Sequence, residues 1–482
     1  MKPGLELMPF QKEGAALLSV SRRAMLVWDP GVGKTPTAVR ACLLASAARI
    51  LVFCPPIGTA VWRQHFKDWS DVRDIRVIDP AGAITPYRFM AGEGVRVVPY
   101  SRARFSSVMR AASSDPWDVV ILDEAHYLKN SSALRTKAIY GFKIDLEGSP
   151  LKNASRVWQL TGTPLLNHPA EFWTHLYALA PDTIILPGFG VMTEEVFTDR
   201  FCVTQPTPYG VRIFGGRNTY ELSQRIKPFV NRKRLKDVIL DMPELRIVEH
   251  SLPADTPIEH ALRAELVQAM SGFEDVESFD SDDELLAAVQ AGGVAFSTIR
   301  RLIGRAKIEG VAELAADELD DAKDDKVIVF AHHREVIEGL TLRLKRFSPL
   351  VIHGGTPMKQ RDLAIEQFQN DERRRLIILA IEAAGEVITL HASHNVIVAE
   401  PSPVPAKNHQ AIARAHRKGQ KHPVLARFVL LPGTLDARLM SIIARKTRDI
   451  AQIVDPTAPL SLSKGQTSEF SQLVGQAFPD TE

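Results

Sequence analysis

The chain has 482 residues, too many for one hydrophobic core, and this length predicts two to three domains. Hydrophobic residues make up 45% and charged residues 24%, which is ordinary for a soluble globular protein and argues against a disordered or fibrous chain. Lysine and arginine total 59 against 57 acidic residues, a formal net charge of +2, so any nucleic-acid site must be a local patch.

The three cysteines show no paired spacing, which argues against disulfides and structural zinc. No apolar run approaches 18 residues, and the amino terminus has no apolar signal core. We therefore expect a cytoplasmic protein, in a bacterial cytosol or an infected host cell, that has no membrane partner.

The first feature with chemical meaning is the segment WDPGVGKT at residues 28–35, which follows an apolar run and precedes a helical stretch. Gly31 and Gly33 permit a tight turn that aims backbone amides at phosphate oxygens, Lys34 adds a positive charge, and the Thr35 hydroxyl can hold Mg²⁺. The phosphate-loop pattern lacks its first glycine, because a tryptophan stands there. On its own, the segment fits a phosphate loop and an ordinary turn equally well.

A second nucleotide element follows at residues 123–126, DEAH, after the strand-like run 119–122. Asp123 can hold Mg²⁺ through water, and Glu124 can orient and deprotonate the attacking water. An acidic pair at a strand end is common by chance. Behind a phosphate loop and ahead of LTGTPLLN at residues 160–167, it predicts a nucleotide hydrolase.

Short apolar runs alternate with helical stretches in two groups, which predicts two parallel sheets covered by helices. The first group is 24–27, 50–53, 95–98, 119–122 and 157–160, and the second is 327–330, 350–352, 376–379, 396–399 and 425–430. The fold class is therefore α/β with two lobes. The predicted domains are residues 1–170 (first lobe), 171–320 (helical insertion or connector), 321–455 (second lobe) and 456–482 (flexible tail).

Charged and terminal segments leave alternatives open. The acidic run 274–284 fits a solvated loop or an autoinhibitory mimic of nucleic acid, and an apolar patch in the tail could dock a protein partner. Two basic groups fit a DNA-binding patch or a solvated helix face equally well. They are Arg232, Lys233, Arg234 and Lys236, then Arg300, Arg301, Arg305 and Lys307.

The stretch SPVPAKNHQAIARAHRKGQ at residues 402–420 carries the last candidate element. A helix beginning near Asn408 would display Gln410, Arg414 and Arg417 on one face. Two guanidinium groups one turn apart can approach a γ-phosphate from a neighbouring lobe, the role of arginine fingers. A solvated basic helix is the alternative.

In this order and spacing, the motifs resemble those of the Swi/Snf family of superfamily-two helicase-like ATPases. The segments LMPFQKEGAALL, VFCPPIGTAVWRQHF, PYSR, DEAHYLKN and LTGTPLLN are similar to motifs Q, Ia, Ib, II and III. NRKRLKDVILDMP is similar to a segment that leads between the family's lobes, and motifs IV to VI follow in order. VIVFAHHREVIEGL looks most like the single-polypeptide HARP-type annealing helicases.

The resemblance implies two RecA-like P-loop lobes, with ATP and Mg²⁺ as cofactors and DNA as partner. It implies an ATP site in which Asp123 and Thr35 hold the metal, and Lys34, Glu124, Arg414 and Arg417 are catalytic. The implied nucleotide-binding residues are Gln11, Gly31, Gly33, Lys34, Thr35, Gly385 and Gln410. The implied contacts to the nucleic-acid backbone are Pro55, Gly58, Thr59, Tyr100, Ser101, His353, Gly354, Gly355 and Ala383. Such contacts tolerate any base sequence and weaken with salt.

The sequence departs from the family in motif V, where AGEVITL at residues 384–390 has Val387 in place of a glycine and Glu386 before it. A branched side chain restricts the backbone there, and weaker coupling of hydrolysis to movement would follow.

The leading hypothesis is a DNA-stimulated ATPase that translocates on duplex or forked DNA, as a monomer, in fork remodelling, strand annealing, replication or repair. The alternatives are a strand-unwinding helicase acting on DNA or RNA, and an ATP-gated DNA clamp within a larger complex that docks through the insertion or the tail.

Overall fold

The structure of the protein is a computed structural model. The structure describes residues 2, 4–56, 58–78, 85–141, 146–162, 168–207, 210–239, 241–253, 294–321, 325–383 and 388–432, with residues 258, 262, 265, 434, 436, 439, 440, 443, 444 and 447. The acidic run 274–284 and the tail 456–482 lie outside the described residues. So do residues 163–167 and 384–387, which include Gly385, Glu386 and Val387.

The first lobe is built on a seven-stranded parallel sheet in the order β11-β1-β6-β5-β2-β4-β3. Its strands are β1 (Arg23–Trp28), β2 (Arg49–Cys54), β3 (Ile75–Val77), β4 (Gly94–Pro99), β5 (Val119–Asp123), β6 (Arg156–Thr161) and β11 (Val230–Lys233). The inner strands are almost wholly buried, as expected for parallel strands that helices cover on both faces.

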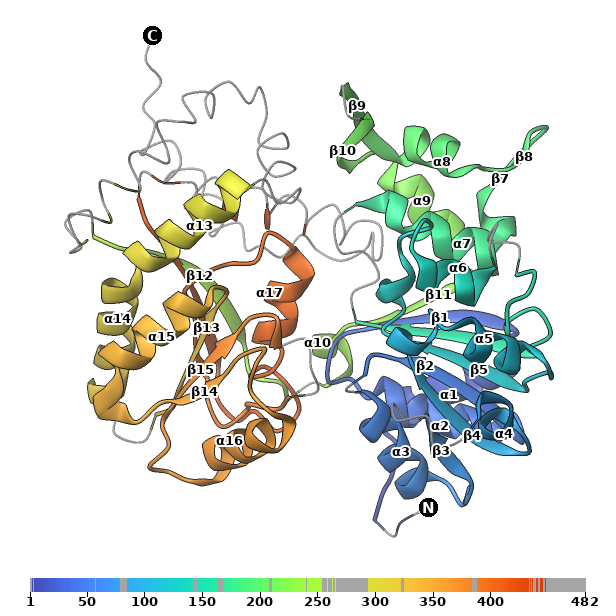
Figure 1. Cartoon of the computed structure of the whole chain (residues 1–482), viewed down its shortest axis with the longest axis horizontal. Coiled ribbons are helices and arrows are strands. Elements are labelled where there is room, and N and C mark those ends of the chain that lie inside the picture. Colours follow the sequence, from blue (N-terminus) through green and yellow to red (C-terminus); the bar gives the residue numbers. More distant parts are fainter. Residues whose placement is uncertain are drawn as a thin grey trace.

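Helices cover both faces of this sheet (Figure 1). One face packs against α1 (Pro9–Val20), α2 (Lys34–Leu44) and α3 (Gly58–Trp69). The other is covered by α4 (Pro86–Met90), α5 (Ser106–Ser113) and α6 (Leu134–Tyr140), and the same core extends away from the sheet into α7 (Trp173–Leu179), α8 (Glu194–Phe201) and α9 (Thr219–Ile226). Two antiparallel pairs, β7 (Ile185–Leu186) with β8 (Gly190–Val191) and β9 (Cys202–Thr207) with β10 (Gly210–Gly216), lie beside α8 and α9.

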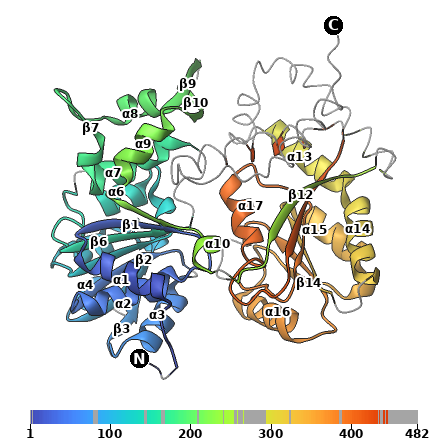
Figure 2. The same cartoon turned by 180° about the vertical axis from the view of Figure 1, so that it is seen from behind.

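The second lobe has a six-stranded parallel sheet in the order β12-β17-β16-β13-β15-β14. Its strands are β12 (Leu245–Ser251), β13 (Val327–Ala331), β14 (Leu350–Ile352), β15 (Leu376–Ala380), β16 (Asn395–Val398) and β17 (Val424–Leu430). Its helices are α13 (Val294–Ala306), α14 (Ile308–Asp321), α15 (Arg334–Arg343), α16 (Met358–Asn370) and α17 (Pro405–Ile412). In both views, α17 lies on the side that faces the first lobe, and α10 (Leu235–Val238) lies between the lobes (Figures 1 and 2).

The predicted α/β fold with two helix-flanked parallel sheets is confirmed, and each predicted apolar run is a strand. The structure differs in the range 171–320, where we expected a helical insertion. β11 from this range joins the first sheet, and β12 joins the second. Phe172, Phe197 and Leu222 pack into the core of the first lobe, whereas α13 and α14 pack into that of the second. We therefore propose that the lobes divide between β11 and β12.

Within the described part of the chain, no helix combines the length and the apolar character that a membrane crossing requires.

Candidate ATP site between two lobes

The phosphate loop connects β1 to the first turn of α2, as predicted. Gly31 and Gly33 have φ angles of +83° and +87°, in the left-handed region that glycine enters without strain. A Cβ on Gly33 would stand 2.2 Å from Nε2 of Gln11, so a larger residue there would displace the Gln11 side chain. Thr35 lies in the first turn of α2, where unpaired backbone amides favour an anion.

Gln11 connects α1 to this loop. Its Nε2 donates to the carbonyl of Val32 at 2.9 Å, and its Oε1 accepts from the amide of Met8 at 2.9 Å. The side chain therefore lies against the phosphate loop, close to the place where the resemblance expects it. Its recognition of adenine stays a prediction.

The unusual Trp28 and Asp29 of the loop are held by the segment around β11. Trp28 Nε1 donates to Asn231 Oδ1 at 2.8 Å, and Asp29 pairs with Arg232 at 2.6 Å. Asp29 also accepts from the backbone amide of Leu235 at 2.9 Å. Trp28 and Asp29, which differ from the usual motif, thus stabilise the loop through contacts with β11 and Leu235. Sequence reasoning missed this role, although a Trp-Asp pair at one site and an Asn-Arg pair at the other offered polar partners.

Lys34 lies close to both acidic residues. Its Nζ donates to the carbonyl of Trp28 at 2.9 Å. Burial lowers the pKa of Lys34, and the nearby carboxylates of Glu124 and Asp123 oppose that shift. The fold therefore brings the predicted lysine and the DEAH carboxylates into one partly buried cluster.

Asp123 ends β5, and both of its carboxylate oxygens accept hydrogen bonds. Oδ1 accepts from the backbone amide of Glu124 at 3.0 Å, and Oδ2 accepts from Trp62 Nε1 at 2.8 Å. Burial and the charge of Glu124 raise the pKa of Asp123. A bound cation would reverse this shift by favouring the carboxylate.

Glu124 has a φ of +48°, a conformation that costs a non-glycine residue energy and that clusters at functional sites. Its Oε2 lies 3.2 Å from His126 Nδ1, which is also 3.3 Å from Thr161 Oγ1. Burial alone would raise the pKa of Glu124, but the contact with His126 and the charge of Lys34 hold it below its usual value. A carboxylate kept ionised in this way can accept a proton from water.

The residues present fit magnesium. Thr35 supplies a hydroxyl and Asp123 a carboxylate, the oxygen ligands that Mg²⁺ takes when water and phosphate oxygens complete its shell. No cluster of three or more His, Cys, Asp or Glu side chains suited to a metal occurs in the part of the chain that the structure describes.

The second lobe contributes arginines to the same cluster. Burial lowers the pKa of Arg414 to about 10, an effect that Arg417 increases and that Glu124 of the first lobe opposes. Cβ of Arg417 lies 3.4 Å from the point where a Cβ on Gly31 would stand. His409 of α17 also interacts electrostatically with the first lobe. Burial lowers the pKa of His409, and the charge of Asp29 opposes this shift.

The prediction that one helix displays Gln410, Arg414 and Arg417 on a single face is wrong in one respect. α17 ends at Ile412, so it contains Gln410, whereas Arg414 and Arg417 lie in the turns that follow. The chain tightens there because the amide of Arg414 bonds to the carbonyl of Ala411 at 3.1 Å, three residues back. The carbonyl of Arg414 accepts instead from Leu390 at 2.8 Å. Arg417 donates to the carbonyl of Ile388 at 2.9 Å and to Thr389 Oγ1 at 2.8 Å.

The predicted DNA contacts follow the carboxyl ends of strands in both sheets. Within each sheet, parallel strands bring these ends to one edge. Pro55, Gly58 and Thr59 follow β2, Tyr100 and Ser101 follow β4, His353, Gly354 and Gly355 follow β14, and Ala383 follows β15. Ser101, Gly354 and Gly355 are exposed, whereas Gly58, Tyr100 and Ala383 are buried. Their contact with nucleic acid stays a prediction.

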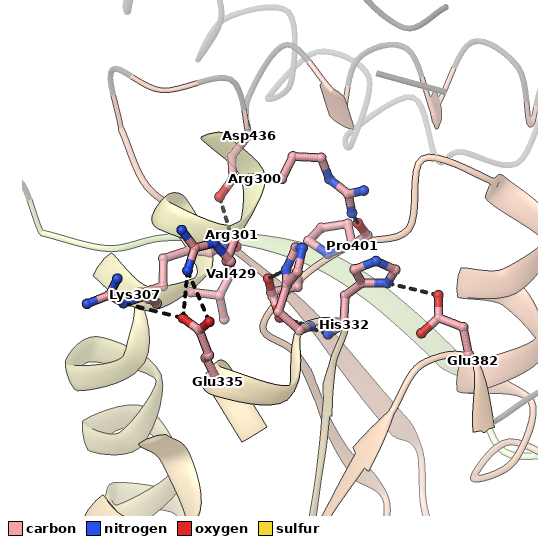
Figure 3. Close-up of polar contacts among 12 residues, drawn as sticks. Arg300, Arg301, Lys307, His332, Glu335, Glu382, Pro401, Val429 and Asp436 are labelled. Atoms are coloured by element: carbon pink, nitrogen blue, oxygen red, sulfur yellow. Dashed lines mark hydrogen bonds and ion pairs between the residues drawn. The ribbon is translucent and has the colours of Figure 1, made fainter. Parts of the chain in front are cut away.

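Several members of the two basic groups are engaged within the protein. Besides Arg232, Arg234 pairs with Asp237, and Lys233 lies 3.6 Å from Glu13. In the second lobe, Figure 3 shows Arg301 paired with Glu335 at 3.0 Å and the buried Lys307 paired with Asp436 at 2.6 Å. His332 and Glu382 form a further pair at 2.8 Å in the same view. These pairs favour neither group as an open DNA-binding patch.

A phosphate loop, a DEAH strand end and arginines from a second lobe define the two-lobed class of helicase-like ATPases. Two families match the chain, the SNF2-related domain over residues 10–261 and the helicase conserved C-terminal domain over residues 307–419. Because the first match spans more than half of its residues, the chain belongs to the SNF2-related family.

Individual relatives extend the match to almost the whole chain. The "SWI/SNF-related matrix-associated actin-dependent regulator of chromatin subfamily A-like protein 1" of Xenopus tropicalis is 29% identical over 99% of this chain and 47% of the relative. The "DNA annealing helicase and endonuclease ZRANB3" of Mus musculus is 28% identical over 96% of this chain and 42% of the relative. The chain thus spans about half the length of the curated relatives it matches.

Among solved structures, the Sulfolobus solfataricus SWI2/SNF2 ATPase core in complex with dsDNA is similar with a TM-score of 0.43 and 18% sequence identity. The similarity covers 100% of this chain and 99% of that chain.

Proposed function

We propose that this chain hydrolyses ATP in response to DNA and uses the cycle to translocate along duplex or forked DNA. The observation that carries the proposal is the placement of Arg417 against Gly31 of the phosphate loop, together with the electrostatic interaction between Arg414 of the second lobe and Glu124 of the first. Because the two halves of the site come from different lobes, hydrolysis depends on how the lobes close. Hydrolysis and lobe movement are then one coupled event.

In the proposed reaction, the γ-phosphoryl group lies over the phosphate loop and is held by Lys34 and the amides at the start of α2. Glu124 takes a proton from the attacking water, whose oxygen forms the new bond to phosphorus as the bond to ADP breaks. Arg414 and Arg417 neutralise charge on the transferred group. Mg²⁺, when bound through Thr35 and Asp123, neutralises charge on the nucleotide oxygens.

The proposed partner is DNA, contacted through its backbone at the carboxyl edges of the two sheets. Fork remodelling or strand annealing is favoured because one relative is named a DNA annealing helicase. Since one chain supplies both halves of the ATP site, a monomer is sufficient for this chemistry. We also propose that the protein acts in the cytosol.

The test is ATP turnover in the presence of duplex, single-stranded and forked DNA at several salt concentrations. We expect stimulation by duplex or forked DNA that weakens with salt. Stimulation by single strands alone would favour an unwinding helicase instead. Displacement of a triplex-forming strand then separates a translocase from an ATP-gated clamp, because only a chain that moves along the duplex displaces it.

A further inference from the structure

Trp62 is a buried residue whose acceptor is unusual. Its side chain is fully buried, and its indole Nε1 donates to Oδ2 of Asp123 at 2.8 Å. Three other buried indoles, those of Trp117, Trp158 and Trp173, donate to main-chain carbonyls. Burying an indole N–H requires an acceptor, but it does not require the carboxylate proposed to hold the metal.

The position of Trp62 on α3 ties it to a predicted DNA contact. α3 begins at Gly58, one helical turn before Trp62. A Cβ on Gly58 would stand 3.8 Å from the same Oδ2 of Asp123. The next residue, Thr59, is only partly buried, and Pro56 before the helix is exposed. Any shift of this first turn moves Trp62 with it, because both belong to one short helix.

A second aromatic residue reaches Asp123 from another predicted DNA-contact segment. The hydroxyl of Tyr100 donates to the main-chain carbonyl of Asp123 at 2.8 Å. The Tyr100 ring stacks on Tyr127 with centroids 5.4 Å apart and an angle of 9° between the planes. Tyr100 is 2% exposed, while Ser101 beside it is exposed. Two segments that present an exposed residue at the sheet edge thus each donate one hydrogen bond to Asp123.

We propose that Trp62, supported by Tyr100, is a positioning residue that transmits DNA contact at the start of α3 to the metal-holding carboxylate of Asp123. Without DNA, Asp123 is held in one orientation by Trp62 Nε1 and by the amide of Glu124. DNA contact adjusts the first turn of α3, and the indole carries this adjustment to Oδ2. The inference deepens the proposed function and rests on it.

The proposed coupling between DNA and the metal site can be measured as a change in nucleotide binding. If DNA changes the affinity for metal-bound nucleotide, the nucleotide changes the affinity for DNA by the same factor. The probe is a fluorescent ADP analogue, bound at equilibrium over a Mg²⁺ titration, with and without a DNA duplex. This readout requires no turnover.

Trp62→Phe keeps most of the ring volume and removes the N–H. We expect it to need about tenfold more Mg²⁺ for ADP binding, as is found when partners of metal ligands are removed, and to lose the gain that duplex gives the wild-type chain. Trp117→Phe makes the same change just before the first residue of β5, whereas Asp123 is its last. There the indole donates to the carbonyl of Ala112 at 2.7 Å. This control should bind and respond as the wild-type chain does.

A duplex-dependent gain in Trp62→Phe that is as large as in wild type would overturn the inference and leave the proposed function intact. A wild-type chain whose ADP binding and ATP turnover both ignore duplex would overturn both. Should Trp62→Phe fail to fold, as thermal unfolding would reveal, Tyr100→Phe replaces it, because that variant removes one hydroxyl from the second connection. A reduced gain in Tyr100→Phe supports the inference, and an unchanged gain contradicts it.

Discussion

Asp29 and Arg232 form an ion pair of 2.6 Å that joins the phosphate loop to the last strand of the first sheet. Both side chains are largely shielded, with exposures of 17% for Asp29 and 23% for Arg232. Arg232 also donates to the carbonyl of Val27 at 3.0 Å, directly before the loop. The segment after β10 therefore shapes the nucleotide site.

Arg232→Gln should weaken ATP binding about tenfold and destabilise the first lobe by about 2 kcal/mol, because it leaves Asp29 with a partly buried and unpaired charge. Lys233→Gln is the matched control, since Lys233 is paired only loosely with the exposed Glu13 at 3.6 Å. Equilibrium binding of a fluorescent ATP analogue and urea unfolding measure the two effects. Wild-type affinity in Arg232→Gln would show that the pair does not support the loop.

The arginines of the second lobe should differ in their effects. Arg414→Ala should lower turnover at least about a hundredfold while ATP binding stays within about threefold, since Arg414 interacts electrostatically with Glu124 and is proposed to act mainly on the transition state. Lys418→Ala, an exposed neighbour on the same segment, should leave turnover unchanged. Single-turnover hydrolysis separates the chemical step from product release. An Arg414→Ala variant that hydrolyses ATP at the wild-type rate would remove this residue from the mechanism.

Arg417 is anchored within its own lobe by Ile388 and Thr389. Thr389→Val removes one anchoring hydrogen bond and leaves the guanidinium in place. If Arg417 must be held to reach the phosphate loop, turnover should fall about threefold to tenfold, the effect of one hydrogen bond of about 1 kcal/mol. Arg417→Ala should have the larger effect in the same assay. Equal rates for Thr389→Val and wild type would show that the anchor is dispensable.

Glu124→Gln should bind ATP with near wild-type affinity and hydrolyse it at least about a hundredfold more slowly, because the amide keeps the shape but does not accept the proton from water. Lys34→Ala should abolish nucleotide-dependent activity. Fluorescent-ATP binding and phosphate release are the two measurements. Normal phosphate release from Glu124→Gln would mean that another group takes the proton.

The sequence predicted the inner strands well and the edges poorly. β5 and β13 are continuous apolar runs because helices cover both of their faces. In the two parallel sheets, the missed strands are the edge strands β3, β11 and β12, whereas the edge strand β14 was predicted; the short antiparallel strands β7 to β10 were missed as well. β11 is VNRK and β12 is LRIVEHS, whose polar residues suit a strand with one open side, so they resemble loops in the sequence. Their places follow from pairing with distant partners, which no local pattern contains.

The residues of the candidate site also differ in how far the local sequence predicts them. The phosphate loop and Asp123 follow from local motifs, because a strand followed by a turn fixes the backbone that carries them. The turns after Ile412 do not follow from a local motif. Residues 411–417 include good helix formers, but the helix ends because this segment makes contacts with Ile388 and Leu390. The bond from Trp62 to Asp123 also lies outside local prediction, because the two residues meet only after β2 and β5 pair.

His175 offers a test of the buried polar network in the first lobe. Its Nδ1 lies 2.9 Å from the hydroxyl of Tyr140 and 3.0 Å from Nε2 of Gln159. Burial, with a smaller effect from His126, lowers the pKa of His175 to about 3. Its ordinary value is about 6.5. The unfolded chain therefore binds a proton there between pH 6.5 and 3, and the folded chain does not.

Stability from this residue is thus fully present above pH 6.5 and is lost as the pH falls towards 3. Between pH 7 and pH 5, His175 should account for a loss of about 2 kcal/mol in the free energy of unfolding. The check is urea unfolding of the wild-type chain and of His175→Gln at both pH values, following the first lobe. Because the other histidines titrate in both proteins, the difference between the two pH dependences isolates His175. Parallel pH dependences would show that His175 is protonated as readily in the folded chain as in the unfolded chain.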